Sequence, residues 1–110
     1  MKRTVFALAR YQDVLAAAEF LSTAFGFVPH EVAKNHVEML VGDDMIMLGE
    51  GKAGGPGIYV AVDDPDTHHD KAVAAGAVVT MGLVDQPYGS REYACKDPEG
   101  NLWFFGTYRP

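Results

Sequence analysis

The tract 85–105 constrains the fold more than any other part of the chain. Residues 92–96 and 102–107 each have the alternating pattern, rich in aromatic residues, that is typical of a strand. Between them, the sequence Asp-Pro-Glu-Gly-Asn at 97–101 is typical of a turn: its proline presets φ, and its glycine and asparagine tolerate positive φ. The sequence therefore predicts an antiparallel hairpin whose second strand carries Leu102, Trp103, Phe104 and Phe105.

The rest of the chain predicts the same order of elements twice. The first half predicts a strand at 5–11, a helix at 14–25 and strands at 28–33, 37–41 and 45–49. The second half predicts a strand at 58–62, a helix at 67–75 and strands at 77–81, 92–96 and 102–107. Asp13 is the expected cap of the first helix, and Asp64 or Asp66 that of the second. Gly26 and Gly76 follow the two helices.

The two closing strands also match residue by residue. Met45-Ile46-Met47-Leu48-Gly49 has the apolar pattern of Leu102-Trp103-Phe104-Phe105-Gly106. The glycine-rich segment 51–57 is expected to be a flexible linker. A chain of 110 residues is one domain in size. The prediction is therefore one α+β domain (1–110) of two βαβββ modules (about 1–50 and about 58–110), whose sheets leave a concave cup opposite the helices.

The motifs resemble those of the vicinal oxygen chelate superfamily, the group of glyoxalases, bleomycin-resistance proteins and extradiol dioxygenases. The resemblance rests on the 97–101 turn with the strand after it and on two helix signatures. The first signature runs from Tyr11 to Phe27, and the second combines Val62-Asp63-Asp64 with Ala74-Ala75-Gly76-Ala77. It covers nearly the whole chain and implies the fold predicted above, often as a homodimer with sites shared between subunits.

Metal-dependent members of this superfamily place His or Glu ligands on four strands. Aligned by the motifs, those places fall at Phe6, Met47, Gly57 and Phe104. Divalent ions of this class prefer imidazole nitrogen and carboxylate oxygen, and a thioether is too soft for them. The sequence therefore predicts no metal and no other cofactor, and it assigns no catalytic residue because no nucleophile–base pair is recognisable.

Strand alternation predicts which side chains face the cup and which pack beneath the helices. The candidate ligand-binding residues are Phe6, Leu8, Met45, Met47, Tyr59, Tyr88, Arg91, Glu92, Leu102 and Phe104, and Ala61 and Ala94 share the cup-facing phase. The helix-side set is Val5, Ala7, Ile46, Leu48, Ile58, Val60, Tyr93, Cys95, Trp103 and Phe105. Glu92 is expected either to contact the ligand or to pair with Arg91 or Arg10. Tyr88 and Gln86 are expected at the rim as hydrogen-bond donors.

Three functions remain open. The leading hypothesis is a metal-independent protein that binds a small organic molecule, with antibiotics and other toxic compounds as candidates. The alternative is a divalent-metal lyase or dioxygenase of the same superfamily, whose ligands the alignment misplaces. The third is a dimeric module whose cup is filled by its own side chains.

Charge and hydropathy limit the partners and the compartment. A net charge of −6 disfavours nucleic acid and anionic membranes, which attract basic surfaces. No stretch approaches the roughly 20 apolar residues of a membrane span, and Arg10, Gln12 and Asp13 interrupt the N-terminal apolar run too early for a signal peptide. The lone Cys95 is expected to be a packed thiol. The expectation is a cytoplasmic homodimer.

Overall fold

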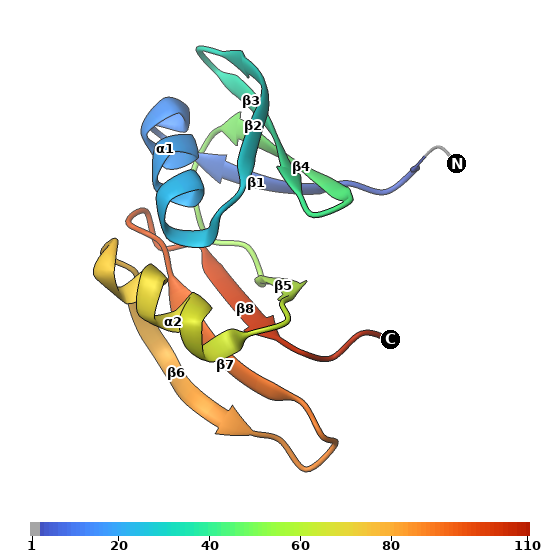
Figure 1. The fold of residues 1–110 in the computed structure, drawn as a ribbon. Coiled ribbons are helices and arrows are strands. Elements are labelled where there is room, and N and C mark those ends of the chain that lie inside the picture. Colours follow the sequence, from blue (N-terminus) through green and yellow to red (C-terminus); the bar gives the residue numbers. More distant parts are fainter. Residues whose placement is uncertain (1–2) are drawn as a thin grey trace.

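The computed structural model describes residues 3–110, which form two modules of the same topology (Figure 1). Module 1 contains β1 (Ala7–Tyr11), α1 (Val14–Phe25), β2 (Val28–Ala33), β3 (His36–Val41) and β4 (Asp44–Glu50). Module 2 contains β5 (Ile58–Ala61), α2 (Pro65–Ala74), β6 (Val78–Asp85), β7 (Arg91–Lys96) and β8 (Leu102–Gly106). The predicted α+β fold of two βαβββ modules is confirmed.

Each module has one four-stranded sheet. The strand orders are β1-β4-β3-β2 and β5-β8-β7-β6, so the strand before each helix lies parallel beside the last strand of its module. Ala7 pairs with Ile46 in the first sheet, and Ile58 pairs with Trp103 in the second. Ile46 and Trp103 therefore occupy equivalent places, as the sequence match of the two closing strands predicts.

The helix ends follow from local sequence. The Asp13 side chain accepts a hydrogen bond from the backbone N–H of Ala16, and the Asp64 side chain accepts one from that of Thr67. Each carboxylate thus satisfies an N–H group that the helix itself leaves unpaired. α1 stops at Gly26, whose φ of 77° suits the left-handed cap.

Both helices lie side by side on one side of the sheets (Figure 1). Their buried faces and the adjoining sheet faces form one core shared by the two modules. The Phe25 ring of α1 lies 5.6 Å from Trp103 and 4.7 Å from Phe105 between ring centroids. The helix-side phase is thereby confirmed for the fully enclosed members of that set, which are Ile46, Leu48, Tyr93, Cys95, Trp103 and Phe105.

The 97–101 turn joins the two modules. Asp97 is buried and accepts hydrogen bonds from the Tyr11 hydroxyl and the Trp103 indole. Glu99 accepts from the backbone N–H groups of residues 12 and 13, just before α1. Asn101 accepts from the backbone N–H of Gly54 and donates to the backbone carbonyl of Arg10. The turn's polar side chains are therefore structural, as its sequence predicts.

Several details differ from the predictions. β1 begins at Ala7, and Val5 is 88% exposed, so its helix-side assignment is wrong: the strand has no partner for it there. Among residues 3–110 positive φ occurs only at glycines, so Asn101 does not use the left-handed region. His68 is partly buried and packs against Phe105, because it lies on the α2 face turned to the core.

Two chemical expectations bear on location and reactivity. Cys95 is free and buried, and burial raises the pKa of its thiol to about 12, which fits a packed rather than a reactive cysteine. Within residues 3–110, no helix combines the length and the apolar character needed to cross a membrane.

Candidate functional site

The sheet faces turned away from the helices, which we call the open faces, carry large apolar side chains. Leu8 is 45% exposed and Tyr59 is 41% exposed, and Phe6, which lies just before β1, is 39% exposed. Their register partners continue the apolar surface, since Leu8 pairs with Met47 and Tyr59 pairs with Phe104. The remaining apolar candidates of the predicted site, Met45, Met47, Leu102 and Phe104, are partly exposed. None of these side chains belongs to the enclosed core.

Two hollows lie where the modules meet. One, of about 480 Å³, is lined by Met45 and Tyr59 of the predicted site, by Arg109, and by residues of the helix-side set, namely Ala7, Ile46, Ile58 and Val60. The other, of about 290 Å³, lies beside the 54–57 linker and is lined by Leu8 and Leu102. The structure thus brings predicted site residues of both modules to shared hollows.

Glu92 is the centre of a polar cluster on the open face of module 2. The residue is only 6% exposed. Tyr88 donates to Oε1 at 2.7 Å, while Tyr59 and Ser90 donate to Oε2 at 2.9 and 3.0 Å. The backbone N–H of Tyr108 donates in turn to the Ser90 hydroxyl at 3.1 Å. We call Tyr59, Tyr88, Ser90, Glu92 and Tyr108 the Glu92 cluster.

A glycine makes room for this cluster. Gly106 of β8 pairs with Glu92 of β7, and Tyr59 reaches from β5 across β8 to meet the carboxylate. A Cβ atom on Gly106 would overlap with the Tyr59 hydroxyl oxygen and with Glu92 Cγ. The missing side chain at 106 therefore allows the hydroxyl to cross the strand.

The hydrogen bonds determine the charge of the cluster. Burial alone would raise the pKa of the Glu92 carboxyl, but the hydroxyls of Tyr88, Tyr59 and Ser90 outweigh it and lower that pKa. The same bonds act oppositely on the phenols. The bond to Glu92 is the main cause that raises the pKa of Tyr88 to about 12. Glu92 is therefore an ionised acceptor at neutral pH.

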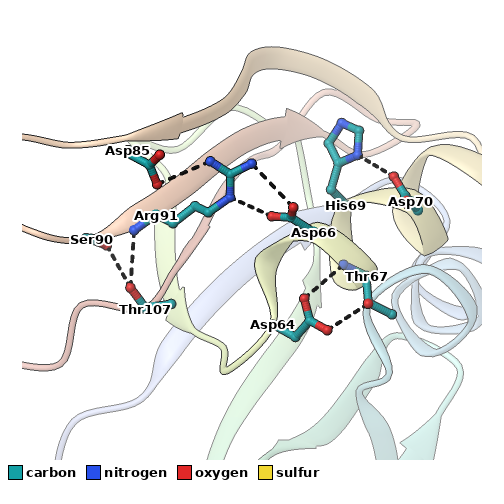
Figure 2. A network of polar contacts seen from close by, with 9 residues as sticks. All are labelled: Asp64, Asp66, Thr67, His69, Asp70, Asp85, Ser90, Arg91 and Thr107. Carbon is teal, nitrogen blue, oxygen red and sulfur yellow. Dashed lines mark hydrogen bonds and ion pairs between the residues drawn. The ribbon is translucent and has the colours of Figure 1, made fainter.

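The predicted salt bridge between Glu92 and an arginine is wrong. Arg91 instead binds Asp66 of α2 at 2.6 Å and Asp85 of β6 at 3.2 Å (Figure 2). Arg10 donates to the backbone carbonyl of Glu50. Successive residues of a strand point to opposite faces, which places the Arg91 side chain on the helix side of β7 and away from Glu92. The structure does not bring Arg91 into the candidate site.

The family resemblance implies a divalent-metal site, but the residues at its four ligand positions do not suit a metal ion. Of its four places, Phe6, Phe104 and Gly57 have no side-chain nitrogen, oxygen or sulfur, and Met47 has only a thioether. The Phe104 ring also fills the space beside Gly57, where a Cβ would lie 2.7 Å from ring atom Cε2. Residues 3–110 contain no group of three His, Cys, Asp or Glu side chains that could hold a metal ion.

Sequence reasoning missed part of the cluster. Ser90 lies two residues before Glu92, which is the spacing that puts two side chains on one face of a strand. That spacing could have identified it. Tyr108 and Gly106 could not be identified in this way, because their roles depend on the Tyr59 side chain crossing β8. Ala94 has the predicted phase but is 2% exposed, so it offers no accessible surface to a ligand.

Comparison with known proteins adds the family. Residues 4–105 match the model of the Glyoxalase/Bleomycin resistance protein/Dioxygenase superfamily. The chain belongs to this superfamily. An uncharacterized protein of Mycobacterium bovis is 30% identical over 115 residues, a match that covers 86% of this chain and 76% of the relative. The resemblance seen in the sequence is thereby confirmed.

Solved structures of the superfamily share the fold. The crystal structure of TioX from Micromonospora sp. ML1 has a TM-score of 0.85 and 28% identity, covering 98% of this chain and all of TioX. The bleomycin-binding protein of Streptomyces verticillus, complexed with copper(II)-bleomycin, has a TM-score of 0.76 and 23% identity, covering 99% and 100% of the two chains. At that identity the second likeness shows the fold alone.

Proposed function

We propose that this superfamily member binds a small organic molecule on its open faces, without a divalent metal. The observation that carries the proposal is the half-exposed state of Leu8 and Tyr59, which line hollows that residues of both modules form. The proposal keeps the cytoplasmic setting that the sequence predicts.

The energetics favour a ligand on this surface. Burial of exposed apolar surface is favourable by about 25 cal/mol per Å². Large contiguous patches of such surface on a protein usually mark an interaction site. Met45 and Met47 add flexible thioether side chains that adapt to ligands of different outline. An organic molecule with aromatic or aliphatic surface is therefore the class that these residues would bind.

The fold is compatible with a bulky ligand. The bleomycin-binding protein with this fold holds copper(II)-bleomycin. This likeness supports, at the level of the fold, an antibiotic or another toxic compound as the ligand.

The chemistry of the site favours binding over catalysis. The only carboxylate of the Glu92 cluster has a lowered pKa, and general bases work best with a pKa near the working pH. The four places of the metal ligands carry no suitable donor, so these positions do not support a lyase or dioxygenase mechanism that needs a metal ion.

We also propose a homodimer of the usual isologous kind, which would share the binding sites between subunits. The outer strand β2 is exposed along its whole length, with Val28 at 54% and Val32 at 58%. A second copy would cover such apolar surface. Sedimentation velocity at micromolar concentration is expected to give a dimer, and a monomer would remove the shared-site model.

Binding can be tested with Nile red, a neutral apolar fluorophore, and two matched variants. Leu8 is 45% exposed on the open face and Leu15 is 46% exposed on α1. Nile red is expected to bind the wild type saturably, Leu8→Asn to weaken binding several-fold, and Leu15→Asn to leave it unchanged. Equal effects of the two substitutions, or no saturable binding, would contradict the proposal.

A further inference from the structure

Glu92 carries a charge that nothing around it neutralises. Within residues 3–110, no Lys, Arg or His nitrogen forms an ion pair with its carboxylate, whereas the neighbouring Arg91 is held by two aspartates of its own. Its partners are three hydroxyl groups. Neutral donors favour the ionised form, but they leave the net charge of −1 in place on a residue that is 6% exposed.

A purely structural role does not require this charge. Glu92 orients Tyr59 and Ser90, whose oxygens accept from the backbone N–H of Tyr108 and so hold the C-terminal segment. A glutamine would keep one oxygen that accepts from such hydroxyls, and its amide NH2 could donate to a hydroxyl oxygen in place of the second carboxylate oxygen. The carboxylate therefore leaves a net negative charge on the open face beyond what these hydrogen bonds require.

Aromatic rings surround the charge on its solvent side. Tyr88 is 60% exposed and Tyr108 is 47% exposed, and their rings meet edge to face with centroids 5.9 Å apart. Ring faces attract cations, and the attraction adds to that of a nearby carboxylate. Because Tyr88 lies in the exposed segment 87–89, its hydroxyl is the donor that an incoming group can replace most easily.

We propose that the Glu92 cluster is the subsite for a positively charged nitrogen of the ligand, such as a protonated amine or an amidinium group, with Glu92 as its counter-ion. This inference rests on the proposed function, in which the apolar part of the ligand lies on the open faces. It adds that the charged end of the same ligand binds at the Glu92 cluster. Tyr59 links the two parts, since it belongs to the cluster and also lines the hollow of about 480 Å³. The ligand class is thereby an amphipathic organic cation.

The test uses three naphthalene probes of nearly equal shape: 2-naphthylmethylamine, which is protonated at pH 7, the neutral 2-naphthylmethanol and the anionic 2-naphthoate. Their affinities for wild-type protein are measured by isothermal titration calorimetry. The amine is expected to bind about tenfold more tightly than the alcohol, and the naphthoate most weakly. Equal affinities of the three probes would overturn the charge assignment while leaving the proposed function intact.

Glu92→Gln removes the charge and keeps an acceptor for the hydroxyls. The variant is expected to bind the amine no more than about twofold to threefold more tightly than the alcohol, with its affinity for the alcohol unchanged. Glu19→Gln, an exposed position on α1, removes the same charge elsewhere and is expected to keep the full preference. A preference that survives in Glu92→Gln would overturn the proposal.

The outcomes also separate this inference from the function on which it rests. The ranking of the three probes on wild-type protein needs no variant, so it remains decisive if Glu92→Gln does not fold. Failure of all three probes to bind would overturn the inference, and failure of Nile red as well would overturn the proposed function with it.

Discussion

The two modules share one topology but divide its tasks differently. In module 1 the helix supplies the core, because α1 buries Val14, Ala17, Ala18, Leu21, Ala24 and Phe25. In module 2 only Pro65 and Ala72 of α2 are buried, and the sheet supplies the large side chains of the core. The open faces differ as well, since module 1 presents apolar side chains and module 2 adds the Glu92 cluster. A repeated fold thus need not repeat the source of its stability or the chemistry of its surface.

The largest expected difference is at the equivalent positions 103 and 46. Trp103 is fully buried, donates to Asp97 and contacts Phe25 of α1, so Trp103→Ala is expected to cost about 3–5 kcal/mol. Ile46→Val removes one methylene at the equivalent position of module 1 and is expected to cost about 0.5–1.5 kcal/mol. Urea unfolding at one fixed protein concentration measures both. A Trp103→Ala variant with wild-type stability would mean that the register of β8 is off by one residue.

An intermediate effect is expected at the equivalent glycines of the two closing strands, Gly49 in β4 and Gly106 in β8. A Cβ on Gly106 would overlap with Tyr59 and Glu92, whereas a Cβ on Gly49 would lie 3.5 Å from the nearest atoms of Arg10 and Leu8. Gly106→Ala is therefore expected to cost about 1–3 kcal/mol, and Gly49→Ala less than about 0.5 kcal/mol. Thermal unfolding of the two variants gives the comparison, and equal costs would contradict the crossing of β8 by Tyr59.

The smallest expected effect is the pH dependence that Glu92 adds. The pKa of Glu92 is lower in the folded chain than in the unfolded chain. The ionised carboxylate therefore stabilises the fold fully at pH values above about 4.3, the pKa of an unperturbed glutamate. That contribution is lost as the pH falls through the folded pKa. The stability difference between wild type and Glu92→Gln is therefore expected to shrink from pH 7 to pH 3. A difference that grows on acidification would show that the pKa is raised instead.

The sequence predicts the fold well because its signals are local and repeated. Asp13 and Asp64 act as caps within one helical turn, and the 97–101 turn carries its own hydrogen-bonding groups. The alternation of the closing strands predicts which side chains enter the core. β1 was predicted too long because apolar composition at Val5 does not reveal where the pairing with β4 begins.

The candidate site is less predictable, because it depends on contacts between strands that are distant in sequence. The phase of Glu92 is correct, but its partners are hydroxyls rather than Arg91 or Arg10. Arg91 binds Asp66 of α2 and Asp85 of β6 instead of Glu92. The sequence spacing of these residues does not predict that they meet. The assignment of ligand-binding residues stays a prediction until binding is measured.

The central claim, that the open faces bind a small organic molecule, is tested most directly by NMR of the protein with ¹³C-labelled methionine methyl groups. Met45 and Met47 lie on the open face of module 1, whereas Met39 is fully buried in the core. On titration with Nile red, the methyl signals of Met45 and Met47 are expected to shift saturably with one shared Kd, and that of Met39 to stay in place. Absence of saturable shifts at Met45 and Met47 would contradict the account.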